Sequence, residues 1–264
     1  MNTVIVIPAR YSSSRFPGKP LAVVAGKTML ERTWLIATAV GNADRVVVAT
    51  DDERISRQAQ GFGAQVVMTP ATCENGTERV YEAIQQLAEL PEIVINLQGD
   101  ALLTPPWAIE VLIDAMHRDD SVGMATIATR LKLDQYREMS KLKAEGIVSG
   151  TTVVFDRNCD ALYFSKALIP FVRHPDENLP VYRHIGLYGY RLPALRQYLS
   201  LAPTPLEKVE GLEMLRMMEN AFKIRVVPVD YRGRTHWSVD SKEDILLAEQ
   251  IIVREGELVT TVCS

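Results

Sequence analysis

The first part of the chain alternates between short apolar runs and longer amphipathic stretches. Residues 3–8 form a β-branched run typical of a strand buried on both faces of a sheet, and 45–50 indicates a second buried strand. Residues 65–69 and 93–97 indicate a third and a fourth strand. Between them, helical patterns cover about 28–40, 51–60 and 77–90. Strands that alternate with helices in this way predict βαβ units and a mostly parallel central sheet with helices on both faces.

After about residue 120 the strand patterns become shorter and more closely spaced. They cover residues 124–130, 152–156, 161–165, 184–191 and 224–229, and helical patterns cover 206–221 and 241–254. The stretch 173–180 is rich in Pro, Asp, Glu and Asn and is expected to be an exposed loop. We therefore predict a single α/β domain over residues 1–264, in which the central sheet is joined by a small strand-rich module.

The charge balance argues against general nucleic-acid binding. The 264 residues are 47% hydrophobic, enough for a sizeable core, and carry a net charge of -4, whereas nucleic-acid binding usually needs a basic face. Three widely separated cysteines, Cys73, Cys159 and Cys263, show no CxxC spacing, so we expect reduced thiols rather than zinc or disulfides. Because no apolar stretch has the length of a membrane span or of a signal-peptide core, we expect a cytoplasmic protein without membrane contacts.

Polar side chains follow the predicted strands at the ends where ligands bind in parallel sheets. The segment 8–20 follows the first strand and contains Arg10, Arg15 and Lys19 together with three consecutive serines. Arg gives forked hydrogen bonds to phosphate oxygens and Lys acts as a compact point charge, so this loop is a candidate triphosphate site. It is neither a Walker A loop, because Pro20 follows Lys19, nor a GxGxxG loop. A solvated basic loop is the plain alternative.

The same loop begins a series of motifs that spans nearly the whole chain. In order, they are PARYSSSRFPGKPL (8–21), VVVATDD (46–52), NGTERV (75–80), NLQGD (96–100), ALYFSKALIP (161–170), RHIGLYGYR (183–191), PLEKVEGLEMLR (205–216) and SVDSKEDI (238–245). This collinear set resembles the signature of the CMP-KDO synthetases, the 3-deoxy-manno-octulosonate cytidylyltransferases. The combination is highly specific, although no single motif would be.

The resemblance implies a nucleotide-diphospho-sugar transferase-like fold, a homodimer, and an enzyme that condenses CTP with an eight-carbon acidic sugar and releases pyrophosphate. It implies Mg²⁺ as the cofactor, with CTP and the acidic sugar as the small-molecule partners. Residues 1–120 are then expected to form mainly the CTP-binding half. Residues 121–222 would form the sugar-binding and dimerisation part, and 223–264 a closing strand and helix.

By resemblance, Asp100 and Asp240 hold the catalytic magnesium. Asp100 follows Gly99 at the end of a predicted buried strand, where a carboxylate can face a ligand crevice, and Mg²⁺ prefers carboxylate and phosphate oxygens. Asp240 lies in a polar segment before the last helix, where its alternative role is to cap that helix. Ser241 would cap equally well, so spacing leaves the two roles of Asp240 open.

The resemblance also assigns a nucleotide-binding set, which consists of Ala9, Arg10, Arg15, Lys19, Arg79 and Gln98. Lys19 is the best candidate to neutralise the charge that develops on the triphosphate, and Lys19, Asp100 and Arg15 are the catalytic candidates. Gln98 carries the donor and acceptor atoms that reading a pyrimidine edge requires. For Arg79 the plain alternative is a surface position in the first turn of a helix.

The acidic sugar is assigned to Lys166, Arg183, His184, Tyr188 and Glu213. His184 and Tyr188 are four residues apart, so on a strand they face the same side, whereas Arg183 faces the other side if the strand begins that early. A lone His is more often structural than catalytic, and the resemblance is what favours a substrate role for His184. Lys166 and Arg173 are candidates to contact the sugar carboxylate.

Four positions depart from the family pattern. Ala101 replaces a usual Glu, Thr152 a usual Lys, Gly211 a usual bulky apolar residue and Met214 a common Gln. Thr152 and Met214 remove a cation and a polar group from the sugar half, so they question the identity of the sugar more than the reaction. The overall resemblance outweighs these four positions, so KDO is the leading substrate. The alternative that the departures favour is an acid that differs from KDO at a ring substituent or in its tail while keeping the carboxylate and the anomeric hydroxyl. Reversion with Met214→Gln and Thr152→Lys should then shift preference towards KDO.

Three other functions stay open at this point. The enzyme could be a cytidylyltransferase for another acid, such as an amino-KDO, a nonulosonic acid or a phosphonate. It could be a nucleotidyltransferase that uses another base. The chain could also be a catalytically silent nucleotide-binding protein, against which the presence of Lys19, Asp100 and Asp240 counts.

Overall fold

The computed structural model describes residues 2–12, 16–147 and 150–259. The chain separates into two compact units, Met1–Asp114 with Tyr231–Ser264 (unit 1) and Ala115–Asp230 (unit 2). Helix α4 (Pro106–Arg118) contains the first passage of the chain from one unit to the other. The predicted functional division at residues 120 and 222 stays a prediction.

Unit 1 is built on four parallel strands in the order β6-β1-β4-β5. They are β1 (Thr3–Ala9), β4 (Arg45–Thr50), β5 (Gln65–Met68) and β6 (Ile93–Leu97). Every residue of β1 and β6 is buried, which explains why both read as continuous apolar runs. The pairing places Val6 of β1 beside Val47 on one side and Asn96 on the other. The carboxyl ends of β1 and β6 therefore lie next to each other.

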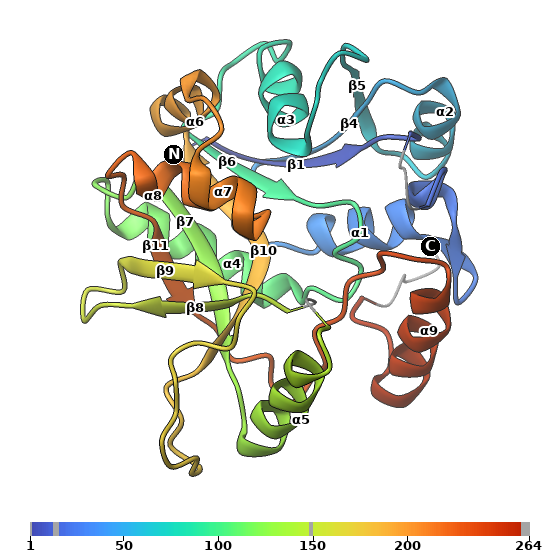
Figure 1. The fold of residues 1–264 in the computed structure, drawn as a ribbon. Helices are drawn as coiled ribbons and strands as arrows, with labels where there is room; N and C mark the ends of the chain where they lie inside the picture. The colour runs from blue at the N-terminus through green and yellow to red at the C-terminus, as the bar shows by residue number, and fades with distance from the viewer. Residues whose placement is uncertain (1, 13–15, 148–149, 260–264) are drawn as a thin grey trace. The chain divides into compact units, whose positions relative to one another are not determined.

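Helices cover both faces of this sheet, with α1 and α3 on opposite sides of β1 (Figure 1). The covering helices are α1 (Met29–Thr38), α2 (Glu53–Gly61) and α3 (Gly76–Ile84), whereas the C-terminal α9 (Glu243–Glu255) contacts β2 (Val23–Val24). The first three begin at polar caps, because Thr28, Asp52 and Asn75 each accept a hydrogen bond from a first-turn amide. The α/β class and the mostly parallel sheet predicted from the sequence are confirmed.

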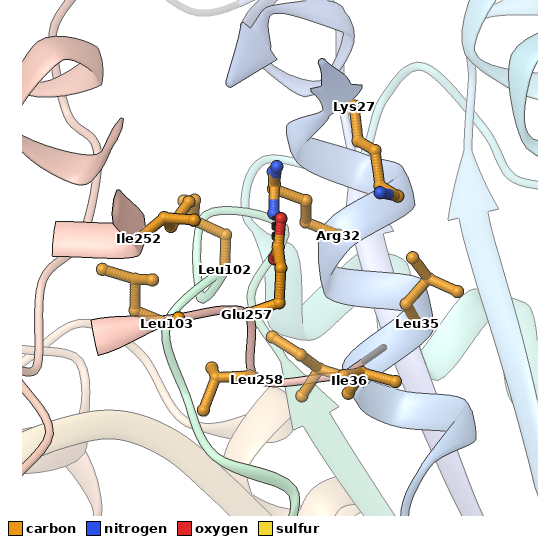
Figure 2. Close-up of a pocket in the computed structure, with 11 residues that line it drawn as sticks. Lys27, Arg32, Leu35, Ile36, Leu102, Leu103, Ile252, Glu257 and Leu258 are labelled. Carbon is orange, nitrogen blue, oxygen red and sulfur yellow. Dashed lines mark hydrogen bonds and ion pairs between the residues drawn. The ribbon is translucent and has the colours of Figure 1, made fainter. Parts of the chain in front are cut away.

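A small hairpin follows the first loop and is held by a buried arginine. Strands β2 (Val23–Val24) and β3 (Lys27–Thr28) are joined by Ala25 and Gly26, both at positive φ, as a tight two-residue hairpin turn requires. The guanidinium of Arg32 donates 2.6 Å hydrogen bonds to the carbonyls of Val24 and Ala25. It also forms a 2.7 Å ion pair with Glu257, just beyond α9 (Figure 2). The C-terminal segment is thereby fastened to the hairpin.

The core beneath the hairpin joins distant parts of the chain. Phe16 and Met29 pack with Val239, which precedes α9, and with Ala248, Ile251 and Ile252 of α9. The final helix, predicted over 241–254, therefore belongs to the same core as the loop after β1. Among the residues that the structure describes, no helix is both long and apolar enough to cross a bilayer.

Unit 2 contains the shorter strands that the second half of the sequence predicts. They are β7 (Met124–Arg130), β8 (Thr152–Phe155), β9 (Ala161–Ser165), β10 (Tyr182–Arg191) and β11 (Arg225–Pro228). Strand β7 pairs in parallel with β11 and antiparallel with β10, and β8 pairs antiparallel with both β9 and β10. The β7–β10 register shifts between Ile185 and Tyr188, where β10 bulges.

The helices of unit 2 differ most from the sequence-based expectations. Helices α5 (Leu133–Ala144) and α6 (Leu192–Ser200) have no predicted counterpart. The single helix predicted over 206–221 is wrong, because two short helices, α7 (Pro205–Glu210) and α8 (Met214–Glu219), take its place. Gly211 ends α7 in the left-handed region at φ 61°, a conformation that a bulky side chain would strain.

Candidate functional site

A polar hollow of about 200 Å³ lies at the carboxyl ends of β1 and β6 in unit 1. Its lining residues come from the loops after these strands and from the segment before α9: Pro8, Ala9, Arg10, Lys19, Pro20, Gln98, Gly99, Asp100 and Asp240. Parallel pairing of β1 and β6 brings the two loops together, as the general geometry of such sheets requires. Most of the predicted nucleotide-binding and metal residues of the described chain therefore share one site.

The backbone around Gly18 fixes the position of Lys19. Gly18 adopts φ 72°, its amide donates a 2.9 Å hydrogen bond to the carbonyl of Tyr11, and a Cβ there would lie 3.1 Å from the Tyr11 ring. Glycine alone fits this turn without strain. A single 3-10 turn, Lys19–Leu21, then begins and directs the lysine into the hollow.

The ammonium of Lys19 lies between two carboxylates. Nζ donates a 2.7 Å hydrogen bond to Oδ2 of Asp100 and lies 3.7 Å from Oδ1 of Asp240. The Lys19 side chain is only 17% exposed, whereas that of Asp240 is 50% exposed. Lys19 is therefore not part of a solvated surface loop, and the two predicted metal ligands face one point.

The alternative role of Asp240 as a helix cap does not agree with the local hydrogen bonds. Helix α9 begins at Glu243, and its N-cap residue is Lys242, which lies two residues beyond Asp240. Asp244 instead reaches back, and its Oδ2 accepts hydrogen bonds from the amides of Asp240 and Ser241 and from the Ser241 hydroxyl. This leaves the Asp240 carboxylate directed towards Lys19.

Arg79 is buried and bound within the protein. Its side chain is 3% exposed, pairs with Asp51 at 3.2 Å and donates a 2.6 Å hydrogen bond to the hydroxyl of Thr69. The surface-helix alternative for Arg79 is therefore wrong. Since Asp51 follows β4 and Thr69 follows β5, the guanidinium ties the carboxyl ends of these two strands to the first turn of α3.

Gln98 lies in the hollow with its amide held by Asn96, to which it donates a 3.0 Å hydrogen bond. A Cβ on Gly76 would lie 3.2 Å from the Gln98 side chain, so the glycine at the start of α3 leaves room for it. Arg10 is exposed and donates a 3.3 Å hydrogen bond to the carbonyl of Glu74. Arg15 lies outside the described residues.

In unit 2, His184 and Tyr188 lie side by side on one face of β10. Their ring centroids are 5.5 Å apart, and their partners on β7 are Ala128 and Thr126, two residues apart. The bulge absorbs two residues of β10 and so preserves the predicted common face. His184 is buried, and its Nε2 lies 2.9 Å from the Thr126 hydroxyl.

An aromatic series leads from Tyr188 towards Glu213. The rings of Tyr188, Tyr190 and Tyr198 follow one another at centroid distances of 6.2 and 6.3 Å, and the Tyr198 hydroxyl donates a 3.0 Å hydrogen bond to Glu213. Burial, with a smaller contribution from the Glu213 charge, raises the pKa of Tyr198 above its usual range, and burial likewise raises the pKa of Tyr188. Both phenols stay neutral hydrogen-bonding groups near neutral pH.

Lys166 and Arg183 occupy another part of unit 2. The backbone amide of Lys166 donates a 2.9 Å hydrogen bond to Glu210, whose other oxygen accepts from Ser165. Arg183 pairs in register with Thr152 of β8 and lies on the face of β10 opposite His184, as its strand position predicts. Its Nε is buried and has no hydrogen-bond partner among the residues that the structure describes.

Comparison with known proteins shows the family. The sequence matches the family model described as cytidylyltransferase over residues 4–224. The chain belongs to the cytidylyltransferase family. A curated relative, the 3-deoxy-manno-octulosonate cytidylyltransferase of Maricaulis maris, is 54% identical over 98% of this chain and 100% of its own length.

Two further relatives of this cytidylyltransferase bear on substrate and fold. The 8-amino-3,8-dideoxy-manno-octulosonate cytidylyltransferase of Shewanella halifaxensis is 40% identical and covers 94% of this chain and 98% of its own. A solved structure of CMP:2-keto-3-deoxy-manno-octonic acid synthetase complexed with CTP is 34% identical with a TM-score of 0.84, covering 97% of this chain and 100% of that one. The predicted family, nucleotidyltransferase-like fold and enzyme class are confirmed.

The structure also shows contacts in the cytidylyltransferase that sequence reasoning missed. The Arg54 guanidinium stacks 3.3 Å from the centroid of the Tyr11 ring and holds the pKa of Asp52 at about 2, mainly through their hydrogen bonds. Tyr11 is thereby held against Gly18 at the turn that positions Lys19. In the sequence, the only indication of this contact is Tyr11 itself, an aromatic residue next to Arg10 in the basic loop.

The four departures from the family pattern have distinct surroundings in this cytidylyltransferase. Thr152 is fully buried; its hydroxyl donates to the Ala167 carbonyl at 2.8 Å and accepts from the Ile169 amide at 3.1 Å. Met214 is also buried, and Ala101 is partly buried. A Cβ on Gly211 would lie 3.2 Å from Nζ of Lys166, so this glycine leaves space for the ammonium.

Other candidate sites contribute little to the chemistry. Cys73 and Cys159 are free thiols, while Cys263 lies outside the described residues. No group of three or more His, Cys, Asp or Glu side chains suited to a metal occurs in the described part of the chain. The pocket beside Arg32 and Glu257 has a volume of only about 20 Å³, too small for a nucleotide (Figure 2).

Proposed function

We propose that this cytidylyltransferase condenses CTP with 3-deoxy-manno-octulosonate to give the CMP-sugar and pyrophosphate. The observation that carries the proposal is the hollow at the ends of β1 and β6, where Lys19 faces Asp100 and Asp240 beside Gln98. The 54% identity to the Maricaulis maris enzyme over almost the whole chain supports this sugar as the substrate.

The reaction joins the anomeric hydroxyl of the sugar to the α-phosphorus of CTP. The hydroxyl loses its proton, the new oxygen–phosphorus bond forms, and the bond to the β-phosphate oxygen breaks so that pyrophosphate leaves. Positioning and charge neutralisation are the main contributions of a protein to such transfers. Lys19 supplies a fixed positive charge beside the phosphates, and Arg10 supplies forked donors at the rim.

The residues of the hollow fit a magnesium ion. Asp100 and Asp240 offer two carboxylates that converge on Lys19, and Mg²⁺ usually takes one or two carboxylates together with substrate phosphate oxygens and water. The bound ion would neutralise charge on the phosphates. Without an ion, Lys19 offsets the repulsion between the two carboxylates and keeps them within the hollow.

Recognition of cytosine is assigned to the amide of Gln98. Its Nε2 donates to Asn96, which fixes the side-chain orientation in the hollow. A fixed amide presents one donor face and one acceptor face to a base, as a pyrimidine edge requires. Arg79 supports the neighbouring strand ends through Asp51 and Thr69.

Pyrophosphate release with CTP, Mg²⁺ and KDO tests the function directly. We expect turnover with CTP to exceed turnover with ATP, GTP or UTP, and CTP with Mg²⁺ to raise the melting temperature most, since ligands that bind only the native state stabilise it. Equal melting shifts with all triphosphates would remove the cytidine assignment, and no pyrophosphate release with any acidic sugar would overturn the activity.

A second substrate, 8-amino-3,8-dideoxy-manno-octulosonate, has a specific observation in its favour. The Shewanella halifaxensis relative that carries this name is 40% identical over almost the whole chain. Direct comparison of kcat/KM for the two sugars decides between them. A higher kcat/KM for the amino sugar would make that sugar the physiological substrate and leave the CTP chemistry unchanged.

A homodimer is proposed from the exposed apolar side chains of unit 2. Leu162, Phe171 and Val209 are 60%, 88% and 84% exposed. Exposed apolar surface of this kind can mark a protein–protein interface, where a second copy would bury it. Sedimentation of the full chain should give a dimer mass, and Phe171→Glu should shift it towards the monomer. A monomeric wild-type protein at micromolar concentration would contradict the assembly.

A further inference from the structure

A group of cations in unit 2 extends beyond Lys166 and Arg183, the two basic residues among those that the family resemblance assigns to the sugar. It consists of Lys143 on α5, Arg183 on β10 and Lys166 after β9. Lys143 Nζ donates a 2.9 Å hydrogen bond to the carbonyl of Gly150. A Cβ added at the same glycine would lie 3.5 Å from Nη2 of Arg183, so the Arg183 guanidinium lies close to the residue that Lys143 binds.

The positive charges of Arg183 and Lys166 both act on Lys143. Burial, followed by the positive charges of Arg183 and Lys166, lowers the pKa of Lys143, and Glu210 acts in the opposite direction. Burial also lowers the pKa of Arg183, which Glu138 opposes. Lys143 thus experiences two positive charges and one opposing carboxylate, and Arg183 experiences the carboxylate of Glu138.

The carboxylate of Glu210 is already hydrogen-bonded to groups other than these cations. Both oxygens of Glu210 accept hydrogen bonds, one from the Ser165 hydroxyl and one from the Lys166 amide. Among the described residues, the buried Nε of Arg183 has no hydrogen-bond partner. Burying a guanidinium charge costs free energy, and an anion bound to the guanidinium would offset part of that cost.

Thr152 is neutral and supplies no cation, and its buried hydroxyl donates to the Ala167 carbonyl and accepts from the Ile169 amide. Those bonds order the segment that carries Lys166. Gly211 in turn leaves room for the Lys166 ammonium. Three separate elements of unit 2 therefore contribute cations to this group. A single solvated lysine on the surface would need no such arrangement.

We propose that Lys143 is a substrate-binding residue that, together with Arg183 and Lys166, receives the carboxylate of the acidic sugar. The inference rests on the proposed function. The triphosphate has its own cations in unit 1, so the second anionic substrate needs a separate set, and a carboxylate matches the forked donors of an arginine.

The test compares Lys143→Met and Lys143→Arg with the matched control Lys141→Met, which removes an exposed lysine from the same helix. Initial rates are measured against the sugar acid at saturating CTP and against CTP at saturating acid. We expect Lys143→Met to raise KM for the acid by roughly 10- to 150-fold, as the loss of a charge-assisted hydrogen bond implies, with KM for CTP unchanged. Lys143→Arg should recover most of the loss.

A second measurement separates carboxylate binding from a structural effect. The carboxamide of the sugar is tested as an inhibitor, and wild type should bind the acid more tightly than the amide while Lys143→Met loses most of that discrimination. Equal acid-to-amide preference in wild type and Lys143→Met overturns the inference. Absence of wild-type turnover with any acid overturns the proposed function instead, and thermal unfolding shows whether each variant is folded.

Discussion

Nζ of Lys19 donates a 2.7 Å hydrogen bond to the carboxylate of Asp100, across 81 residues of sequence. The contact exists because β1 and β6 are parallel neighbours, so the loops that follow them meet at one edge of the sheet. Asp240 joins from the segment before α9. The charge of the proposed nucleotide site is therefore set by three loops.

The proposed metal role of the two carboxylates predicts large losses of activity with little change in stability. Asp100→Asn and Asp240→Asn each keep the side-chain shape but remove a charge, and we expect kcat to fall by roughly 100-fold or more. Steady-state rates and thermal unfolding check both effects. Asp134→Asn is the matched control, because it makes the same change at an exposed aspartate on α5. Near-normal turnover in Asp240→Asn would exclude that residue as a ligand.

The burial of Arg79 predicts that its conservative replacement is costly even without nucleotide. Arg79→Lys keeps the charge but cannot reach Asp51 and Thr69 with the same fork, so we expect a loss of roughly 1–3 kcal/mol in the free energy of unfolding. Urea unfolding of the apo protein measures it. The exposed Arg57→Lys serves as the control. Unchanged apo stability together with weaker CTP binding would instead assign Arg79 to the nucleotide.

The hydrogen bonds of Thr152 change the expectation for its reversion to lysine. Thr152→Lys should destabilise the protein by more than about 2 kcal/mol, because a long charged side chain would enter a fully buried position and break bonds to Ala167 and Ile169. Thr152→Ser keeps the hydroxyl and should lose less. Chemical unfolding of both variants decides; a stable Thr152→Lys enzyme with improved kcat/KM for KDO would restore the prediction made from the sequence.

The ion pair between Glu207 and Arg216 predicts a pH-dependent contribution to stability. Burial tends to raise the pKa of Glu207, but the hydrogen bonds from Arg216 outweigh it and hold the pKa below its usual 4.5. The stabilisation is therefore complete above pH 4.5 and is lost as pH falls below that value. Glu207→Gln should cost roughly 1.5–3 kcal/mol near neutral pH.

Urea unfolding of wild type and Glu207→Gln at several pH values follows this difference, which should shrink in acid. Glu219→Gln is the matched control, because this exposed carboxylate accepts a hydrogen bond from the amide of Leu206 and forms no ion pair with Arg216. A difference between wild type and Glu207→Gln that stays constant through the acid range would contradict the assignment of the effect to this carboxylate.

Local sequence predicted the elements whose burial is uniform along their length. Strands β4 and β6 have the predicted boundaries, because runs of β-branched residues buried on both faces leave little alternative. The motifs at the ends of β1 and β6 also identified Lys19 and Asp100 as chemistry-bearing residues. Helices α5 and α6 went unpredicted, because only a few of their residues, including Met139, Leu195 and Tyr198, are buried and their apolar pattern is correspondingly weak.

The sequence by itself determined the α/β class, the family and the residues that could carry the chemistry, since these depend on local pattern and on collinear motifs. Tertiary structure alone decided which of those residues meet and which are already bound. The strand order placed Lys19 against Asp100. At the start of α9, the side chain of Asp244, and not that of Asp240, accepts the hydrogen bonds from the preceding backbone amides. Tertiary structure also buried Arg79 in an ion pair with Asp51, and it placed Lys143 and Arg183 beside the same glycine, Gly150. Such pairings depend on distances between elements far apart in the chain, which residue spacing along the sequence does not encode.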